Sequence, residues 1–210
     1  GRLLRREYYA GADDALNRVS FLADDDAGEP DWRLAEYAYL GLGQVIEIHH
    51  EEPDLLFTLA HGAGYDPYAG LDRFDRTVDM RWTCCMGGSS GSGSSGEPGD
   101  CEGELVEQVC YGYDRASNRT HRAMPVAEAA GRKLDELYGY DRLHRLVDFD
   151  RGKLTRDDDL IDPLVRKAQW TLDATGNWSR FRRFDQHDAD AALDQTREHN
   201  GVNEVTDIAE

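Results

Sequence analysis

Two stretches of this sequence share a design that narrows the choice of fold more than any other feature. Residues 111–120 and 138–146 both begin Tyr-Gly-Tyr-Asp and continue into turn-forming and then strand-forming residues. Alternate residues of an extended strand face the same side, so Tyr111 and Tyr113 are expected on one face. Asp, Ser and Asn stabilise turns by bonding to nearby backbone groups. Each stretch therefore predicts a strand, a tight turn and a second strand, and their recurrence indicates a repeat.

The repeat extends along the chain when the residue three positions after the aspartate is used as a register mark. Successive marks are 26, 32, 42, 27, 32 and 27 residues apart. The longest interval contains a 14-residue Gly, Ser, Glu and Pro tract at 87–100, which predicts a flexible insertion; subtracting it leaves 28. We therefore expect residues 1–210 to form about seven copies. The register residues are Asn17, Gly43, Asp75, Ser117, His144, Gly176 and Asn203.

The copies share an aromatic pair, an aspartate and the turn residues that follow it. We interpret these residues as structural, because aromatic rings pack between neighbouring hairpins and an aspartate can cap a turn. The alternative is that the rings and arginines form a ladder that binds a ligand. The signature residues are Tyr37, Tyr39, Gly43, Asp72, Tyr111, Tyr113, Asp114, Asn118, Tyr138, Tyr140, Asp141, Arg145, Trp170, Asp173, Gly176 and Asn177.

Between the turns the pattern is mostly that of short strands. Val78, Met80 and Trp82 alternate with polar residues, which predicts a half-buried strand. Residues 126–137 contain helix formers, but Gly131 in their middle favours a short turn or hairpin loop over a long helix. A single hairpin cannot bury its apolar side alone. The expected fold is all-β, with stacked antiparallel β-hairpin repeats forming a continuous spiralling sheet.

The string Tyr-x-Tyr-Asp-x-x-[Gly/Ser/His]-[Asn/Arg]-[Arg/Leu] at 111–119 and 138–146 resembles the signature of the YD-repeat, or Rhs (rearrangement hotspot), family. That family includes bacterial polymorphic toxins, the B and C components of insecticidal toxin complexes, wall-associated proteins and teneurins. The resemblance implies a ribbon of β-hairpins that spirals into a hollow shell, which encloses a C-terminal toxic domain in the toxin members. It also implies export or display at the cell surface. The family's self-cleaving Asp-Pro-x-Gly cap has no counterpart here, since residues 66–70 have the wrong spacing.

Charge restricts the partners. With 42 acidic and 24 basic residues the formal net charge is −18, which argues against nucleic acid and against an anionic membrane surface. No apolar run reaches the length that spans a bilayer, so membrane insertion is not expected. The first residues lack the apolar stretch of a signal peptide, so a signal would lie upstream. The expected partners are neighbouring repeats of the same or another chain, a toxin cargo or a cell-surface receptor.

Four cysteines, Cys84, Cys85, Cys101 and Cys110, flank the Gly/Ser-rich tract. An even number within one window permits disulfides that would close this loop, and such crosslinks are typically worth a few kcal/mol. Free thiols are the second interpretation. A zinc site is the third, although zinc sites usually combine two closely spaced cysteine pairs.

The other candidate site is a group of aspartates whose oxygens could coordinate calcium, although it lacks the glycine and final glutamate of an EF-hand loop. No phosphate loop, nucleophile elbow or zinc-protease motif is present, so we expect neither an enzyme nor a cofactor other than, at most, calcium. These aspartates are Asp185, Asp188, Asp190 and Asp194.

Together these observations predict a structural scaffold of an exported or cell-surface protein, which builds a shell or an elongated support. Two alternatives stay open. One is an adhesion module that binds a glycan or a protein. The other is a self-assembling extracellular fibre, in which the open edges of sheets pair between chains.

Overall fold

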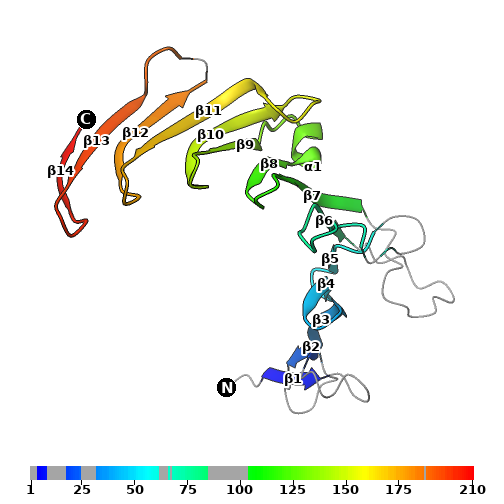
Figure 1. Ribbon diagram of the computed structural model, residues 1–210. Helices are drawn as coiled ribbons and strands as arrows, with labels where there is room; N and C mark the ends of the chain where they lie inside the picture. Colours follow the sequence, from blue (N-terminus) through cyan, green and yellow to red (C-terminus); the bar gives the residue numbers. More distant parts are fainter. Residues whose placement is uncertain are drawn as a thin grey trace. The chain divides into compact units, whose positions relative to one another are not determined.

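The computed structural model describes residues 4–8, 18–24, 32–61, 66, 68–84, 104–186 and 188–210, which form fourteen strands and one short helix (Figure 1). The strands are β1 (Leu4–Tyr8), β2 (Val19–Asp24), β3 (Trp32–Leu40), β4 (Gln44–His50), β5 (Leu55–Thr58), β6 (Asp79–Cys84), β7 (Glu104–Tyr113), β8 (Arg119–Ala123), β9 (Asp135–Tyr140), β10 (Leu146–Leu154), β11 (Ile161–Leu172), β12 (Trp178–Asp185), β13 (Leu193–His199) and β14 (Val205–Ala209). The helix is α1 (Pro125–Ala129).

All fourteen strands belong to one open antiparallel sheet, and each strand lies beside the strands that precede and follow it in the chain. The prediction of stacked antiparallel hairpins in a continuous sheet is confirmed. This topology has only local connections, because antiparallel neighbours can be joined by short turns. The described part of the chain contains no helix long and apolar enough to cross a membrane.

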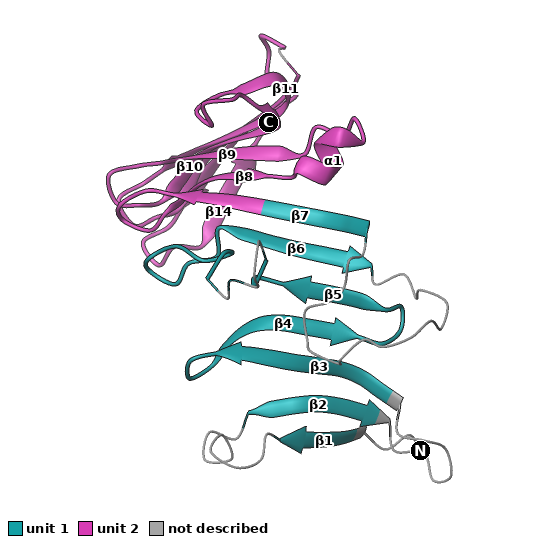
Figure 2. Cartoon of the chain, turned by 90° about the vertical axis from the view of Figure 1, so that its right-hand side faces the viewer, with its two compact units in different colours: residues 1–109 teal, residues 110–210 magenta. Residues whose placement is uncertain are grey.

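The chain divides into two compact units, Gly1–Val109 and Cys110–Glu210, which Figure 2 shows in different colours. Unit 1 contains a small apolar core of Ile46, Leu59, Ala60 and Leu71. Residues 68–78, between β5 and β6, pack against this core through Leu71. They are held there by two backbone bonds, from Gly70 N to Leu59 O at 2.8 Å and from Val78 N to Gly70 O at 2.8 Å.

Most aromatic residues in the strands of each unit lie on one face of its sheet, and Phe21 and Phe184 lie on the opposite face. In unit 1 the ladders pair Tyr37 with Ile48, Ile48 with Phe57 and Phe57 with Trp82, so these side chains share a face. In unit 2 we call the side of Tyr138 the aromatic face and the opposite side the ion-pair face. The rings of the aromatic face are Tyr111, Tyr113, Tyr138, Tyr140, Phe149, Trp170, Trp178 and Phe181.

Helix α1 lies in the stretch where the sequence favours a turn. Pro125 occupies its first turn, where the missing N–H costs nothing, and the helix ends after one turn. Gly131 follows at φ +76° and donates its N–H to Glu128 O at 2.8 Å. The buried Asp135 carboxylate accepts hydrogen bonds from Met124 N at 2.7 Å and Leu154 N at 3.0 Å, and it thereby fixes the connection to β10.

Candidate functional site

The signature aspartates all organise a five-residue turn in the same way. At Asp141, Oδ1 accepts the backbone N–H of Leu143 at 2.8 Å and of Arg145 at 3.0 Å. Oδ2 accepts from Arg145 Nε at 2.7 Å. Two backbone bonds close the turn, from Asp141 N to Arg145 O at 2.9 Å and from His144 N to Asp141 O at 3.1 Å. The same arrangement occurs at Asp72, Asp114 and Asp173.

The fourth residue of each such turn adopts the left-handed conformation, with φ between +59° and +97°. Five predicted register residues occupy this position: Asp75, Ser117, His144, Gly176 and Asn203. Gly43 differs, because the turn between β3 and β4 is only three residues long and its positive φ, +58°, belongs to Gly41. This copy lacks the aspartate, and Arg18 Nη1 donates to Gly41 O at 2.7 Å. Asn17 lies outside the described residues.

One turn keeps the geometry with donor and acceptor exchanged. Asn200 Oδ1 accepts the N–H of Val202 and of Glu204, both at 3.0 Å. Its amide then donates to Glu204 Oε2 at 2.8 Å. The first and fifth positions therefore need complementary groups, and either position can supply the donor.

Neighbouring turns in unit 2 are also bonded to one another. Asn118 Nδ2 lies 2.8 Å from His144 Nδ1, and Asn177 Nδ2 donates to Asn203 Oδ1 at 3.0 Å. Arg145 Nη1 donates to Asp173 O at 2.8 Å. The fifth turn residue thus bonds both its own turn and the next, which couples one hairpin to its neighbour.

These contacts lower the pKa of the turn aspartates. The pKa of Asp173 falls to about 2 because the Thr175 hydroxyl, the Asn177 amide and two backbone N–H groups donate to its carboxylate. The pKa values of Asp72 and Asp114 fall chiefly through the fifth turn residue's side chain, and that of Asp141 chiefly through the Arg145 backbone N–H. Each carboxylate is therefore stabilised in its ionised form.

The lowered pKa predicts acid-sensitive folding. Around pH 3, Asp173 binds fewer protons in the folded state than in the unfolded state, so it stabilises the folded state. This contribution to the free energy of unfolding is complete above the ordinary pKa of 3.8 and is lost as pH falls towards about 2. We expect Asp173→Asn to flatten the pH dependence of the urea midpoint between those values. Asp190→Asn, at an exposed position outside the repeat turns, is the control. Equal slopes for wild type and Asp173→Asn would contradict the assignment.

The aromatic face contains one buried carboxylate. Glu136 is 4% exposed, and it accepts hydrogen bonds from Arg151 Nε at 3.1 Å and from the Tyr138 hydroxyl. Arg122 Nη2 lies 2.8 Å from the same carboxylate. Burial, and then the bond to Glu136, raise the pKa of Tyr138 to about 12. This cluster joins β8, β9 and β10.

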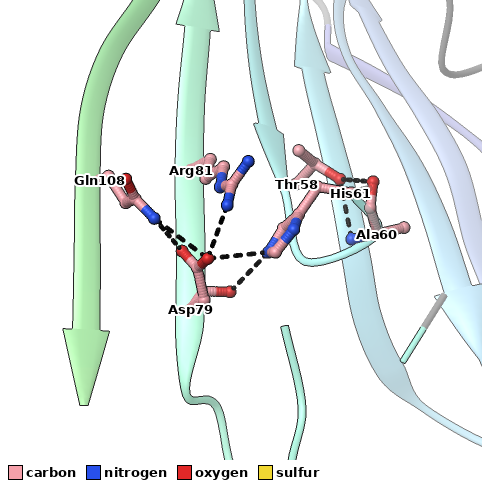
Figure 3. A network of polar contacts seen from close by, with 6 residues as sticks. All are labelled: Thr58, Ala60, His61, Asp79, Arg81 and Gln108. Carbon is pink, nitrogen blue, oxygen red and sulfur yellow. Dashed lines mark hydrogen bonds and ion pairs between the residues drawn. The ribbon is translucent and has the colours of Figure 1, made fainter. Parts of the chain in front are cut away.

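Unit 1 has a comparable polar centre at Asp79, where β6 begins (Figure 3). Its carboxylate accepts from Arg81 Nη2 at 2.9 Å and from Gln108 Nε2 at 2.9 and 3.0 Å, and His61 Nε2 lies 3.4 Å away. Burial opposes its ionisation, but Arg81 and Gln108 donate to the charged form and keep the Asp79 pKa below 3.8. Both carboxylate oxygens accept hydrogen bonds, and the bond from Gln108 links β6 to β7.

The predicted cysteine and calcium sites are only partly within the described residues. Cys84 ends β6 and Cys110 lies in β7, both half-buried, whereas Cys85 and Cys101 lie outside the described residues. The disulfides therefore stay a prediction. Of the calcium candidates, Asp194 is engaged by Arg180 Nε at 2.7 Å. Within the described ranges no three His, Cys, Asp or Glu side chains cluster as metal ligands.

The fold of this chain is similar to parts of several solved structures, among them a holotoxin. The chain is similar to part of a mutant Photorhabdus luminescens Tc holotoxin pore, with a TM-score of 0.58 and 14% identity over 93% of this chain and 8% of that chain. It is similar to part of the TcdB2-TccC3-Cdc42 crystal structure, with a TM-score of 0.60 and 14% identity over 96% of this chain and 9% of that chain. What they share is the fold.

A third structure, TcdB2-TccC3-TEV, gives a TM-score of 0.58 at 14% identity over 95% of this chain and 9% of that chain. The chain spans less than a tenth of the length of each of these three structures. No protein-family model and no curated protein sequence matches it.

Sequence reasoning missed Glu136 and Asp135, which are buried, and the half-buried Asp79. Their signal was present in part, because an acidic residue at an inward strand position needs cationic or backbone donors nearby. Apart from Arg81 and Tyr138, those donors lie 11 to 29 residues away in the sequence on neighbouring elements, so no pattern within one strand reveals them. The links between neighbouring turns were missed for the same reason.

Proposed function

We propose that this chain is a scaffold segment of a larger exported or cell-surface YD-repeat protein, in which it forms part of a continuous β-sheet wall. The observation that supports this most directly is the row of capped turns in unit 2, each bonded to its neighbour. These turns make the sheet extendable one hairpin at a time. The fold shared with toxin-complex structures supports a wall that holds a toxin cargo.

Export is part of the proposal. Four cysteines in one window suit an oxidising compartment, where disulfides form and persist. Thiol trapping of the protein as its host produces it tests this. Complete alkylation without prior reduction would count against export.

A scaffold built of equivalent repeats should tolerate the loss of one repeat in register. Removing residues 142–173 joins Asp141 to Ala174, which restores an aspartate-capped turn ending at Asn177. It would also pair Tyr138 with Phe181 and Glu136 with Arg183, in place of Phe149 and Arg151. We expect the shortened protein to keep its β-type circular dichroism and to unfold cooperatively.

The matched control removes residues 142–172 instead. A shift of one residue moves every side chain of the following strand to the opposite face of the sheet, so this variant should aggregate or lose its β signal. If both deletions are equally damaging, unit 2 depends on particular residues and not on interchangeable repeats, and the scaffold proposal fails.

A further inference from the structure

The two faces of unit 2 differ in how their charges are compensated. On the ion-pair face, Lys167 Nζ lies 3.0 Å from both Asp148 and Asp150 carboxylates, and Arg180 Nε donates to Asp194 at 2.7 Å. Arg182 donates to the Gln169 side chain at 2.9 Å. The cations of this face therefore have short-range partners within the sheet.

The aromatic face carries an excess of positive charge. Seven cations and three carboxylates on the ladders of β7 to β13 give this face a net charge of +4, within a chain whose net charge is −18. Such a concentration of cations on an acidic protein creates a local positive potential. The charged residues are Glu107, Arg119, Arg122, Glu136, Arg151, Lys153, Arg166, Arg183, Asp185 and Arg197, of which Lys153 is paired with Glu128 of α1.

Four of these arginines share two carboxylates, Arg122 and Arg151 with Glu136 and Arg166 and Arg183 with Asp185. The other two contact rings or amides. Arg197 lies 3.6 Å above the Trp178 ring and donates to the Gln195 side chain, and Arg119 lies 4.0 Å above the Tyr111 ring. The Arg183 side chain is 40% exposed, and its Nε makes no hydrogen bond among the described residues but lies 3.8 Å from Asp185 Oδ1. A guanidinium stacked on a ring keeps its in-plane N–H groups available for a carboxylate.

We propose that the aromatic face of unit 2 binds an acidic polypeptide segment in an extended conformation. Alternate side chains of an extended chain point the same way, so carboxylates at every second position could face the arginines together while the other side chains point away from the sheet. A second copy docking through the same face is disfavoured by the like charges of the two faces. Nucleic acid is disfavoured by the net charge of the whole chain. This binding does not depend on the scaffold role.

The test measures fluorescence anisotropy of a labelled peptide of about 16 residues, Glu-Tyr-Glu-Ser repeated, with the complete chain at low ionic strength. We expect saturable binding that weakens as salt is added. Arg183→Gln combined with Arg197→Gln should weaken binding about tenfold. Arg180→Gln combined with Arg182→Gln removes the same charge from the ion-pair face and should change binding less than about twofold.

Circular dichroism verifies that both double variants are folded, and tryptophan fluorescence of the unmodified chain gives an independent readout through Trp170 and Trp178 on the aromatic face. Equal losses in the two double variants would overturn the proposal, because net charge alone would then explain binding. A matching lysine peptide that binds as well would also overturn it. So would a single-stranded DNA oligomer that binds more tightly than the acidic peptide, which would reassign the face to nucleic acid.

Discussion

Glu136→Gln is expected to lower the free energy of unfolding by about 3 kcal/mol, because it removes the one carboxylate that compensates two arginines. Glutamine preserves the size of the side chain, so packing is retained and charge is what changes. Arg122 and Arg151 remain 28% and 35% exposed, which keeps part of their hydration and places the effect at the lower end for a broken buried pair. Urea unfolding followed by circular dichroism measures it.

The same variant has a second readout at Tyr138. Its pKa of about 12 depends on burial and then on the bond to Glu136, so the substitution should move this titration down towards the ordinary value of 10.0. Ultraviolet difference titration against wild type detects the shift. Asp194→Asn, which breaks the exposed pair with Arg180, is the control and should leave both stability and the Tyr138 titration nearly unchanged. A stable Glu136→Gln protein with an unmoved titration would refute the role of Glu136.

Gly70→Ala is expected to destabilise unit 1 by about 3 kcal/mol or more, because backbone surrounds this glycine closely. A Cβ at this position would lie 2.3 Å from Asp79 O and 2.6 Å from Leu59 O. Neither atom can move alone, since Leu59 O already accepts the Gly70 N–H and Asp79 begins β6. The added methyl group must therefore displace the segment that packs against the core.

Gly43→Ala is the matched control in the same unit. Nothing lies within 4 Å of a Cβ there and the residue has no positive φ, so the change should stay within about 0.5 kcal/mol of wild type. Comparing the urea midpoints of the two variants separates steric exclusion from the general effect of replacing glycine. Similar midpoints would show that the segment around Gly70 shifts freely, contrary to the close contacts.

The all-β fold was predictable from the sequence because its turns are encoded locally. Asp114 and Asn118 lie within five residues of each other and carry the groups that close the turn between them. Turns of this kind can be predicted from the sequence spacing of these residues alone. The sequence did not reveal that Gly41, and not Gly43, has the positive φ in its turn, because this three-residue turn has no aspartate to set the register.

The grouping of side chains on faces could not be predicted in the same way. Strict alternation fails where the ladders shift register, as between Gly112 and Tyr113 and again between Arg151 and Gly152. Each shift is set by contacts with a neighbouring strand; a Cβ on Gly112, for example, would lie 2.2 Å from the His121 ring. The burial of Glu136 and the excess of arginines on its face follow from these pairings.

The turn from Asn200 to Glu204, in which donor and acceptor are exchanged, shows that the five-residue turn tolerates different formal charges. An Asp–Arg pair such as 141 and 145 is neutral, whereas the Asp–Asn pair at 173 and 177 and the Asn–Glu pair at 200 and 204 each carry −1. All three close the same five-residue turn. The net charge along this edge of the sheet can therefore change one turn at a time, while the path of the backbone stays the same.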